Sequence, residues 1–245
     1  MTTLTQEQID WLDKCANGRW TLNPKTGLVD VDGGFYCSDQ GLTDFKGIKF
    51  GVVKGSFNCK NNSLTSLEGA PHKVGESFFC NSNRLTSLVG APQNVGENFW
   101  CYGNRLTSLV GAPQRVDGYF SCSYNQLTTL VGAPQRVGME FSCSYNQLTS
   151  LVGAPQRVGR ELWCEANRLT SLEGAPQKVG KSLYFKNNTI SEKTLLLIYE
   201  TMCTHKCDYH KALTLIKDKI DMKDKIELGF YKGHERATSI ICRYI

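Results

Sequence analysis

The chain has 245 residues, of which 40% are hydrophobic, 10% aromatic and 21% charged. This aromatic content is too high for a disordered chain, and no apolar run approaches the roughly 18 residues that a membrane-spanning helix needs. Twenty-eight basic and 23 acidic residues give a net charge of +5, without the clustered basic composition typical of nucleic-acid-binding proteins. Residues 1–7 also lack the basic and apolar regions of a signal peptide. We therefore expect a soluble, cytoplasmic protein without membrane contact, and we do not expect nucleic acid as its partner.

The N-terminal segment, residues 1–34, is predicted to form a helical cap and an entry strand. Thr5 and Gln8 have the spacing of a capping box, which marks the start of a helix. An apolar stripe that includes Trp11 follows, and the helix is expected to end near Gly18. This helix would cover the first repeat described below.

A 21-residue unit organises the middle of the chain, residues 35–190. Six copies follow the pattern L-T-S-L-x-G-A-P-x-x-V-G, two further residues, and F-x-C-x-x-N. They keep strict register, with cysteines at 59, 80, 101, 122, 143 and 164 and an asparagine three residues after each. A degenerate copy around Cys37 precedes them and another around Phe185 follows them, which gives about eight rungs.

The short unit cannot bury its own apolar face, so the copies are expected to stack on a shared core. Side chains alternate along F-x-C, which predicts a short strand with Phe and Cys inward, and the recurring Asn suits a bend bonded to backbone groups. The G-A-P segment excludes a helix on the returning side, and Gly69 and Gly75 with their copies are interpreted as turn residues. The sequence thus predicts an α/β repeat solenoid with one parallel sheet of about eight short strands, an extended convex side and a helical cap at each end.

The order P-x-x-V-x-x-F-x-C-x-x-N-x-L-x-x-L resembles the leucine-rich repeat. It is similar to the short form found in type III secreted effectors and in repeat proteins of bacteria and phages. The resemblance covers residues 35–190 and is specific for fold, but much less so for function. It implies a bacterial or phage protein that acts as an effector or as an inhibitor of a host enzyme, in the host cytoplasm if a phage encodes it. Effectors of this type often add a ubiquitin-ligase domain of a few hundred residues; because about 55 residues follow the repeats here, we do not expect ligase activity.

The C-terminal segment, residues 191–245, is predicted to cap the other end of the solenoid. Ser191 is a candidate N-cap residue for the first of two helices, which together extend through Ile220. A final packed segment is expected around the apolar residues Ile240, Ile241 and Tyr244.

Eleven cysteines, an odd number, cannot all pair within one chain. Seven are expected to form one inward ladder, because parallel side chains in register point alongside rather than at each other. We interpret them as free, small apolar core residues, which requires a reducing compartment. These residues are Cys37, Cys59, Cys80, Cys101, Cys122, Cys143 and Cys164.

A second cluster, Cys203, His205, Cys207 and His210, places four potential zinc ligands within eight residues. On a single helix, however, His205 would point away from the other three. We therefore favour simple packing and predict no metal site, no cofactor and no enzymatic activity. An enzyme site around Cys203, Cys207 and His210 is kept as a third interpretation of the function.

Binding residues are expected on the outward side of the predicted strands, the concave face that solenoids commonly use. Four serines form a trough there between Trp100 and Trp163, which are three strand spacings apart, about 14 Å. Exposed Trp, Tyr and Arg are the residue types that anchor interfaces. The predicted binding set is Phe79, Arg84, Trp100, Tyr102, Arg105, Tyr119, Ser121, Ser123, Tyr124, Ser142, Ser144, Tyr145, Trp163, Glu165, Arg168 and Tyr184.

The leading interpretation of this face is a non-enzymatic protein that binds a macromolecular partner, in the first place another protein. The alternative is capture of a small nucleotide or sugar in the trough between Trp100 and Trp163. A surface without binding function is also open, since aromatic neighbours stabilise adjacent strands and a recent duplication of two nearly identical rungs explains the four serines.

A row of basic residues recurs two positions after each proline except one, where Asn94 interrupts it. It would line up on the convex side or an edge and could meet an acidic partner or phosphates, but a solvated row of charges is the more frequent outcome. The row consists of Lys73, Arg115, Arg136, Arg157 and Lys178.

Overall fold

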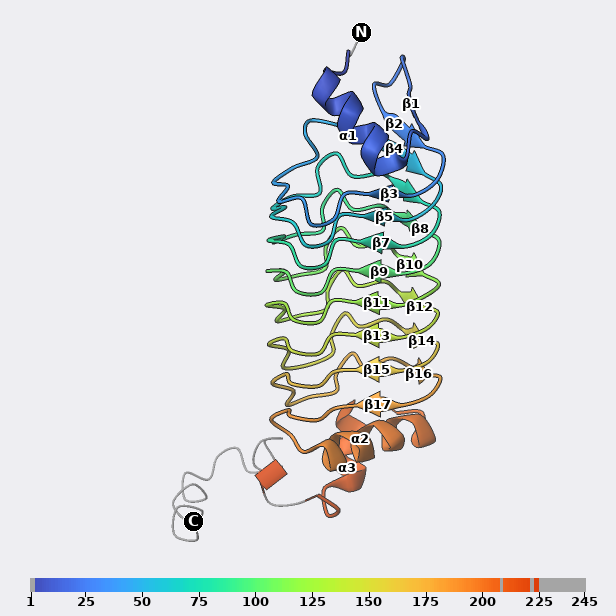
Figure 1. Ribbon diagram of the computed structural model, residues 1–245. Coiled ribbons are helices and arrows are strands. Elements are labelled where there is room, and N and C mark those ends of the chain that lie inside the picture. The colour runs from blue at the N-terminus through green and yellow to red at the C-terminus, as the bar shows by residue number, and fades with distance from the viewer. Residues whose placement is uncertain (1–2, 208, 221–222, 225–245) are drawn as a thin grey trace.

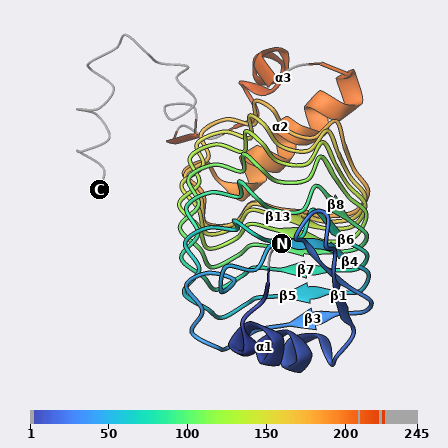
Figure 2. The same ribbon diagram turned by 90° about the horizontal axis from the view of Figure 1, so that it is seen from above.

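The computed structural model of the protein describes residues 3–207, 209–220 and 223–224. These residues form a parallel β-solenoid, a stack of coils with helices at both ends (Figure 1). The view along the stack shows successive coils with similar outlines (Figure 2). The predicted segment around Ile240, Ile241 and Tyr244 lies outside the described residues.

One strand from each coil contributes to an eight-stranded parallel sheet, here called the front sheet. The strands pair in register, so that Phe120 lies beside Phe141 and Ser121 beside Ser142. The sheet confirms the predicted F-x-C strands and the eight rungs. Its strands are β3 (Phe35–Tyr36), β5 (Phe57–Asn58), β7 (Phe78–Phe79), β9 (Phe99–Trp100), β11 (Phe120–Ser121), β13 (Phe141–Ser142), β15 (Leu162–Trp163) and β17 (Leu183–Tyr184).

The returning side of the coils is extended, as predicted, and it also pairs into two back sheets that the sequence analysis did not predict. In strands such as Arg136–Val137 the basic residue is exposed and the valine is buried. The first back sheet contains β1 (Trp20–Leu22), β2 (Val29–Val31), β4 (Phe50–Val53), β6 (Lys73–Val74) and β8 (Asn94–Val95). The second contains β10 (Arg115–Val116), β12 (Arg136–Val137), β14 (Arg157–Val158) and β16 (Lys178–Val179).

Two glycine columns of the repeat have different roles. Gly69 has a φ of 86°, in the left-handed region that favours glycine, which confirms its predicted turn. Gly75 and its copies also lie at bends of the chain, as predicted, but their φ angles are not positive, so the bend alone does not require glycine. A Cβ atom at Gly96 would instead collide with the carbonyl oxygen of Gly75 on the preceding coil, so glycine is needed for the close approach of the coils.

Asp117 interrupts this second glycine column, and the two back sheets separate at this coil, between β8 and β10. A Cβ atom has no space at the equivalent Gly96 and Gly138. The Gly96 N–H donates to the Val74 carbonyl over 3.1 Å, and within the described residues the Asp117 coil lacks this bond. One residue further on the coils stay bonded as elsewhere, since the Gly118 N–H donates to the Glu97 carbonyl over 3.0 Å. We attribute the break in the back sheets to the Asp117 side chain.

The core is a column of aromatic and aliphatic side chains along the solenoid axis. Phenylalanine rings stack from Phe35 to Phe141, with centroids 5.3–5.7 Å apart between successive coils. The two leucines of each L-x-x-L, such as Leu127 and Leu130, are fully buried behind them. The core therefore repeats with the sequence, as the inward Phe, Cys and Leu predicted.

A buried asparagine ladder links neighbouring coils. The Asn125 Nδ2 group donates to the Cys122 carbonyl of its own coil at 3.0 Å and to the Cys101 carbonyl of the preceding coil at 3.1 Å. Its Oδ1 atom accepts from the backbone N–H of Leu106. The same pattern recurs at Asn83, Asn104, Asn146 and Asn167 and confirms the predicted ladder.

Helix α1 (Gln6–Ala16) covers the N-terminal end of the solenoid. Thr5 and Gln8 form the predicted capping box, and Asn17 ends the helix in the left-handed conformation. The Trp11 ring packs edge-on against Phe35 of the first front strand, with centroids 5.2 Å apart. The helix therefore shields the exposed end of the core.

Helices α2 (Glu192–His205) and α3 (Tyr209–Ile216) cover the other end (Figure 1). Ser191 is the N-cap of α2, as predicted. Helix α3 ends four residues before the predicted limit at Ile220, although the Ile220 side chain is buried. Within the described part of the chain, no helix has both the length and the apolar character needed to traverse a bilayer.

Candidate functional site

A hollow of about 210 Å³ lies in the middle of the outward face of the front sheet. Short serine side chains on β11 and β13 lie between the bulky tryptophans of β9 and β15, which leaves this space. It is lined by Trp100, Tyr119, Phe120, Ser121, Glu140, Ser142 and Trp163. Five of these belong to the predicted binding set, and Phe120 and Glu140 are additional.

Stacked aromatic pairs form the two walls of the hollow. Trp100 stacks on Tyr119 with centroids 5.9 Å apart and an interplanar angle of 16°. On the far side, Trp163 stacks on Tyr184 at 3.8 Å and 13°. Tyr102 supports the first wall by an edge-on contact with Trp100 at 6.2 Å. These contacts fix the orientation of both indole rings.

The four predicted trough serines separate into two groups. Ser121 and Ser142 line the hollow, whereas Ser123 and Ser144 do not. Ser123 Oγ lies 2.7 Å from Ser142 Oγ, and Ser144 Oγ accepts from the backbone N–H of Glu165 at 3.1 Å. The hollow is therefore narrower than the predicted trough, and Glu165 and Tyr102 lie outside its lining.

Two glutamates occur together at the hollow, where Glu140 lines it and Glu161 holds the same position on the next coil. Burial, repulsion by the Glu161 carboxylate and a hydrogen bond to it raise the pKa of Glu140, which Arg160 and Lys181 partly oppose. Glu161 lies 3.7 Å from the Arg160 Nε atom and 3.9 Å from the Lys181 Nζ atom. Its buried Oε2 atom nevertheless accepts no hydrogen bond from the part of the chain that the structure describes. Sequence reasoning did not select either glutamate, although both occupy an outward-facing column of the repeat.

Tyr124 and Tyr145 follow β11 and β13 and form an exposed stack. Their ring centroids are 4.2 Å apart and the rings nearly parallel, and 57% of the surface of Tyr124 and 48% of that of Tyr145 are exposed. Both have positive φ angles, 55° and 57°, as this position has in every coil, where the other residues are Asp39, Asn61, Ser82, Gly103, Ala166 and Asn187. A bulky residue is unfavourable in this conformation, so the local backbone does not explain the choice of tyrosine.

The remaining predicted residues lie around the hollow. Arg84, Arg105 and Arg168 are exposed and immediately follow the asparagine ladder. Phe79 is half-buried on β7, beside Trp100 in the register of the front sheet. The predicted set therefore lies on the front sheet and on the bends that follow it.

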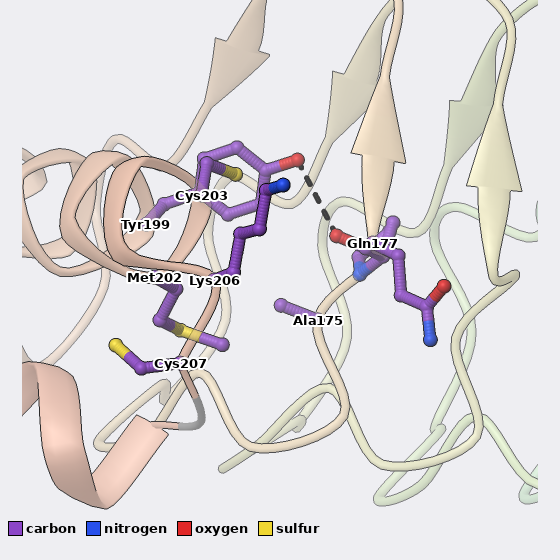
Figure 3. Close-up of a pocket in the computed structure, with 8 residues that line it drawn as sticks. Ala175, Gln177, Tyr199, Met202, Cys203, Lys206 and Cys207 are labelled. Atoms are coloured by element: carbon purple, nitrogen blue, oxygen red, sulfur yellow. Dashed lines mark hydrogen bonds between the residues drawn. The ribbon is translucent and has the colours of Figure 1, made fainter.

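A larger pocket, of about 390 Å³, lies between α2 and the last coils (Figure 3). The Tyr199 hydroxyl donates to the Pro176 carbonyl across it at 3.3 Å, and burial raises the pKa of this hydroxyl. Cys203, Cys207 and Lys206 line it, whereas His205 and His210 do not. The residues of the third interpretation are therefore not brought together in this pocket.

The structure does not support the zinc hypothesis for the same segment. Cys203, His205 and His210 are exposed, while Cys207 is half-buried with its thiol directed to the Thr201 carbonyl at 3.8 Å. Among the described residues, no three His, Cys, Asp or Glu side chains are placed to hold a metal ion.

The predicted basic row lies on the back sheets. Its members are exposed, and Arg136 pairs with Arg115 on one side and Arg157 on the other. Arg115 also forms a 2.6 Å ion pair with Asp117. An exposed pair of this kind contributes little to stability.

The seven ladder cysteines are buried free thiols, as predicted. Burial, and to a smaller degree the neighbouring Cys80 and Cys122, raise the pKa of the Cys101 thiol. The Cys143 thiol donates to the Cys164 sulfur atom over 3.3 Å. A raised pKa keeps a buried thiol such as that of Cys101 protonated and unreactive.

Comparisons with known proteins leave the function to be argued from the structure. No protein-family model matches the chain, and no curated protein shows significant sequence similarity to it.

Proposed function

We propose that the protein binds a macromolecular partner, in the first place another protein, through the outward face of the front sheet. The observation that carries this proposal is the hollow between the Trp100–Tyr119 and Trp163–Tyr184 pairs. Two large aromatic pairs beside an indentation are the arrangement that anchors a partner side chain at the centre of an interface. The exposed arginines Arg84, Arg105 and Arg168 would supply charge complementarity around it.

The size of the hollow favours a macromolecule over the small-ligand alternative. Pockets for small molecules commonly have about 300–1,000 Å³. At about 210 Å³ the hollow is smaller and fits one protruding side chain better than a nucleotide. A macromolecular partner would draw the remaining affinity from the surrounding face.

The Tyr124–Tyr145 stack supports the same proposal. Each tyrosine retains a large, exposed ring on a backbone conformation that costs an ordinary residue about 1–2 kcal/mol. The fold imposes this conformation on every coil, including those with Ser82 and Ala166, so the large exposed rings are what distinguishes these two coils. The stack would extend the contact surface beyond the hollow.

The resemblance to the short leucine-rich repeat adds a proposal about biological setting. We propose that the protein belongs to this class and acts as a bacterial or phage effector or as an inhibitor of a host enzyme, without catalytic activity of its own. The solenoid architecture is consistent with the class, and repeat solenoids use such sheet faces for binding.

The test is capture of a partner from cell lysate by the full chain, followed by an affinity measurement with the purified partner. Replacing Trp100 and Trp163 together by Ala is expected to weaken binding at least about tenfold while shifting the melting temperature by only a few degrees. Tyr36→Ala, a truncation of an exposed aromatic on β3, is the matched control and should leave binding unchanged. Equal binding by the double variant and the wild type would refute the proposal.

A further inference from the structure

The hollow has the chemistry of a cation site. Glu140 is the charged residue in its lining, and the other lining groups are aromatic rings and serine hydroxyls. The faces of indole and phenol rings attract cations through their quadrupoles. We propose that the hollow receives the guanidinium group of an arginine side chain that projects from the partner; this inference rests on the proposed function.

The two glutamates provide the electrostatic argument. Glu140 and Glu161 repel each other, and Arg160 and Lys181 approach Glu161 only at 3.7 and 3.9 Å. The buried Oε2 atom of Glu161 has Arg160 as an ion-pair partner but accepts no hydrogen bond from the described residues, and an unsatisfied buried acceptor costs about 1–3 kcal/mol. A cationic donor beside Glu140 would reduce the repulsion and bring hydrogen-bond donors to the carboxylate pair.

Shape distinguishes guanidinium from ammonium. The tryptophans are about 14 Å apart along the sheet, and the Tyr119 ring, 5.9 Å from Trp100, fills part of this span. A planar group stacked on an aromatic face fits the remaining gap, and guanidinium is planar and carries five donors in a fork that matches carboxylates. An ammonium group is compact and strongly hydrated, so it would lose more hydration free energy than a guanidinium group on entering the hollow.

The experiment titrates the full chain with three capped amino acids: N-acetyl-arginine, N-acetyl-lysine and N-acetyl-citrulline methylamides. Citrulline has the shape of arginine without its charge. Tryptophan fluorescence reports binding, because Trp100 and Trp163 form the walls, whereas Trp11 and Trp20 lie at the N-terminal end of the solenoid and give a constant background. We expect the arginine probe to bind at least about tenfold more tightly than the citrulline probe and about threefold more tightly than the lysine probe.

Glu140→Gln keeps the size of the side chain and removes its charge. It should bring arginine binding to within about threefold of citrulline binding, whereas Glu173→Gln, at an exposed glutamate outside the front sheet, should leave the preference unchanged. Melting curves establish that both variants are folded. Equal binding of arginine and citrulline, preference for lysine, absence of a response to arginine, or an unchanged Glu140→Gln variant would each overturn the assignment.

The partner captured for the proposed function separates the two proposals. If Trp100→Ala with Trp163→Ala abolishes partner binding but Glu140→Gln and excess arginine probe do not affect it, the interface stands and the guanidinium assignment fails. If partner binding survives loss of both tryptophans, the proposed function itself fails.

Discussion

The Oδ1 atom of Asn125 accepts a 2.9 Å hydrogen bond from the backbone N–H of Leu106, nineteen residues earlier in the chain. The same side chain donates to three carbonyls, each of which keeps one other donor, so Asn125→Ala would remove four hydrogen bonds and leave the buried Leu106 N–H without its acceptor. At about 1–3 kcal/mol for an unsatisfied group, we expect a loss of about 2–4 kcal/mol in the free energy of unfolding, measured by urea denaturation. The neighbouring Gln126 is exposed, and Gln126→Ala should change stability by less than about 0.5 kcal/mol. A similar loss in both variants would contradict this role of the ladder.

The back-sheet break predicts that Asp117→Gly stabilises the protein. Glycine would allow β8 and β10 to pair, and each added backbone hydrogen bond would stabilise the folded state by about 0.5–1.5 kcal/mol. The conformational entropy that glycine loses on folding would offset about 0.5–1 kcal/mol of this gain. We expect a melting temperature higher by about 2–4 °C. Asp117→Ala is the matched control, because it removes the Arg115 ion pair but keeps a Cβ atom. An equal gain with alanine would show that charge, rather than space, separates the sheets.

Thiol protection tests the cysteine ladder. Burial raises the pKa of the Cys122 thiol, and the neighbouring Cys143 adds to the rise. In the native protein at pH 8, iodoacetamide should therefore label the exposed Cys203 while the seven ladder cysteines stay unmodified, as resolved by peptide mass spectrometry. Urea should make all of them reactive. Rapid native labelling of Cys122 would show that the core opens far more easily than its packing implies.

The Glu140 carboxyl should make stability depend on pH. Because its pKa is raised in the folded state, the folded protein holds this proton more tightly than the unfolded chain does. Stability is then lost as the pH rises through the interval between the unfolded pKa of 4.5 and the higher folded pKa. Glu140→Gln should accordingly raise the melting temperature at pH 7, and the gain should disappear near pH 4. A gain of equal size at both pH values would mean that packing, rather than repulsion from Glu161, is responsible.

The tyrosine stack predicts that binding and stability can be separated. Replacing Tyr124 and Tyr145 together by Asn, the residue that Asn61 and Asn187 provide in other coils, relieves the positive-φ strain but removes the ring stacking. The strain relieved and the stacking energy lost are of similar size and opposite sign, so the free energy of unfolding should change by less than about 1 kcal/mol. Partner affinity should fall at least about fivefold, measured with the captured partner. Unchanged affinity would remove the stack from the proposed interface.

The repeat made the front sheet and core predictable, because a one-residue shift of register would bring polar residues into positions such as those of Phe120 and Cys122. The back strands are harder to predict. From β6 onward each is two residues long, and its pairing depends on whether the following residue lets the next coil approach, as the contrast between Gly138 and Asp117 shows. Short strands of this kind have no periodicity of their own.

The outward-facing positions of the repeat predicted where the candidate site lies, but they did not predict its shape. Strand alternation placed Trp100 and Trp163 on the front face, yet the Trp100–Tyr119 stack joins residues on neighbouring strands and depends on side-chain rotation. The same limit applies to Ser123, which bonds to Ser142 instead of lining the hollow. The sequence did not identify Glu140 as a site residue, because a polar residue is common at an outward-facing position. Only the structure shows that the Glu161 carboxylate interacts with it.

The spacing of the two tryptophan walls depends on how many coils separate them. The coils of β11 and β13 carry the same Phe-Ser-Cys-Ser-Tyr-Asn-Gln-Leu sequence, and each pairs with its neighbours in the same parallel register. Unequal recombination between such copies would add or delete one whole coil and change the gap by about 4.8 Å, with the core and both caps preserved. The solenoid can thus evolve a wider or narrower binding site in steps of one coil, while the packing of its core stays the same.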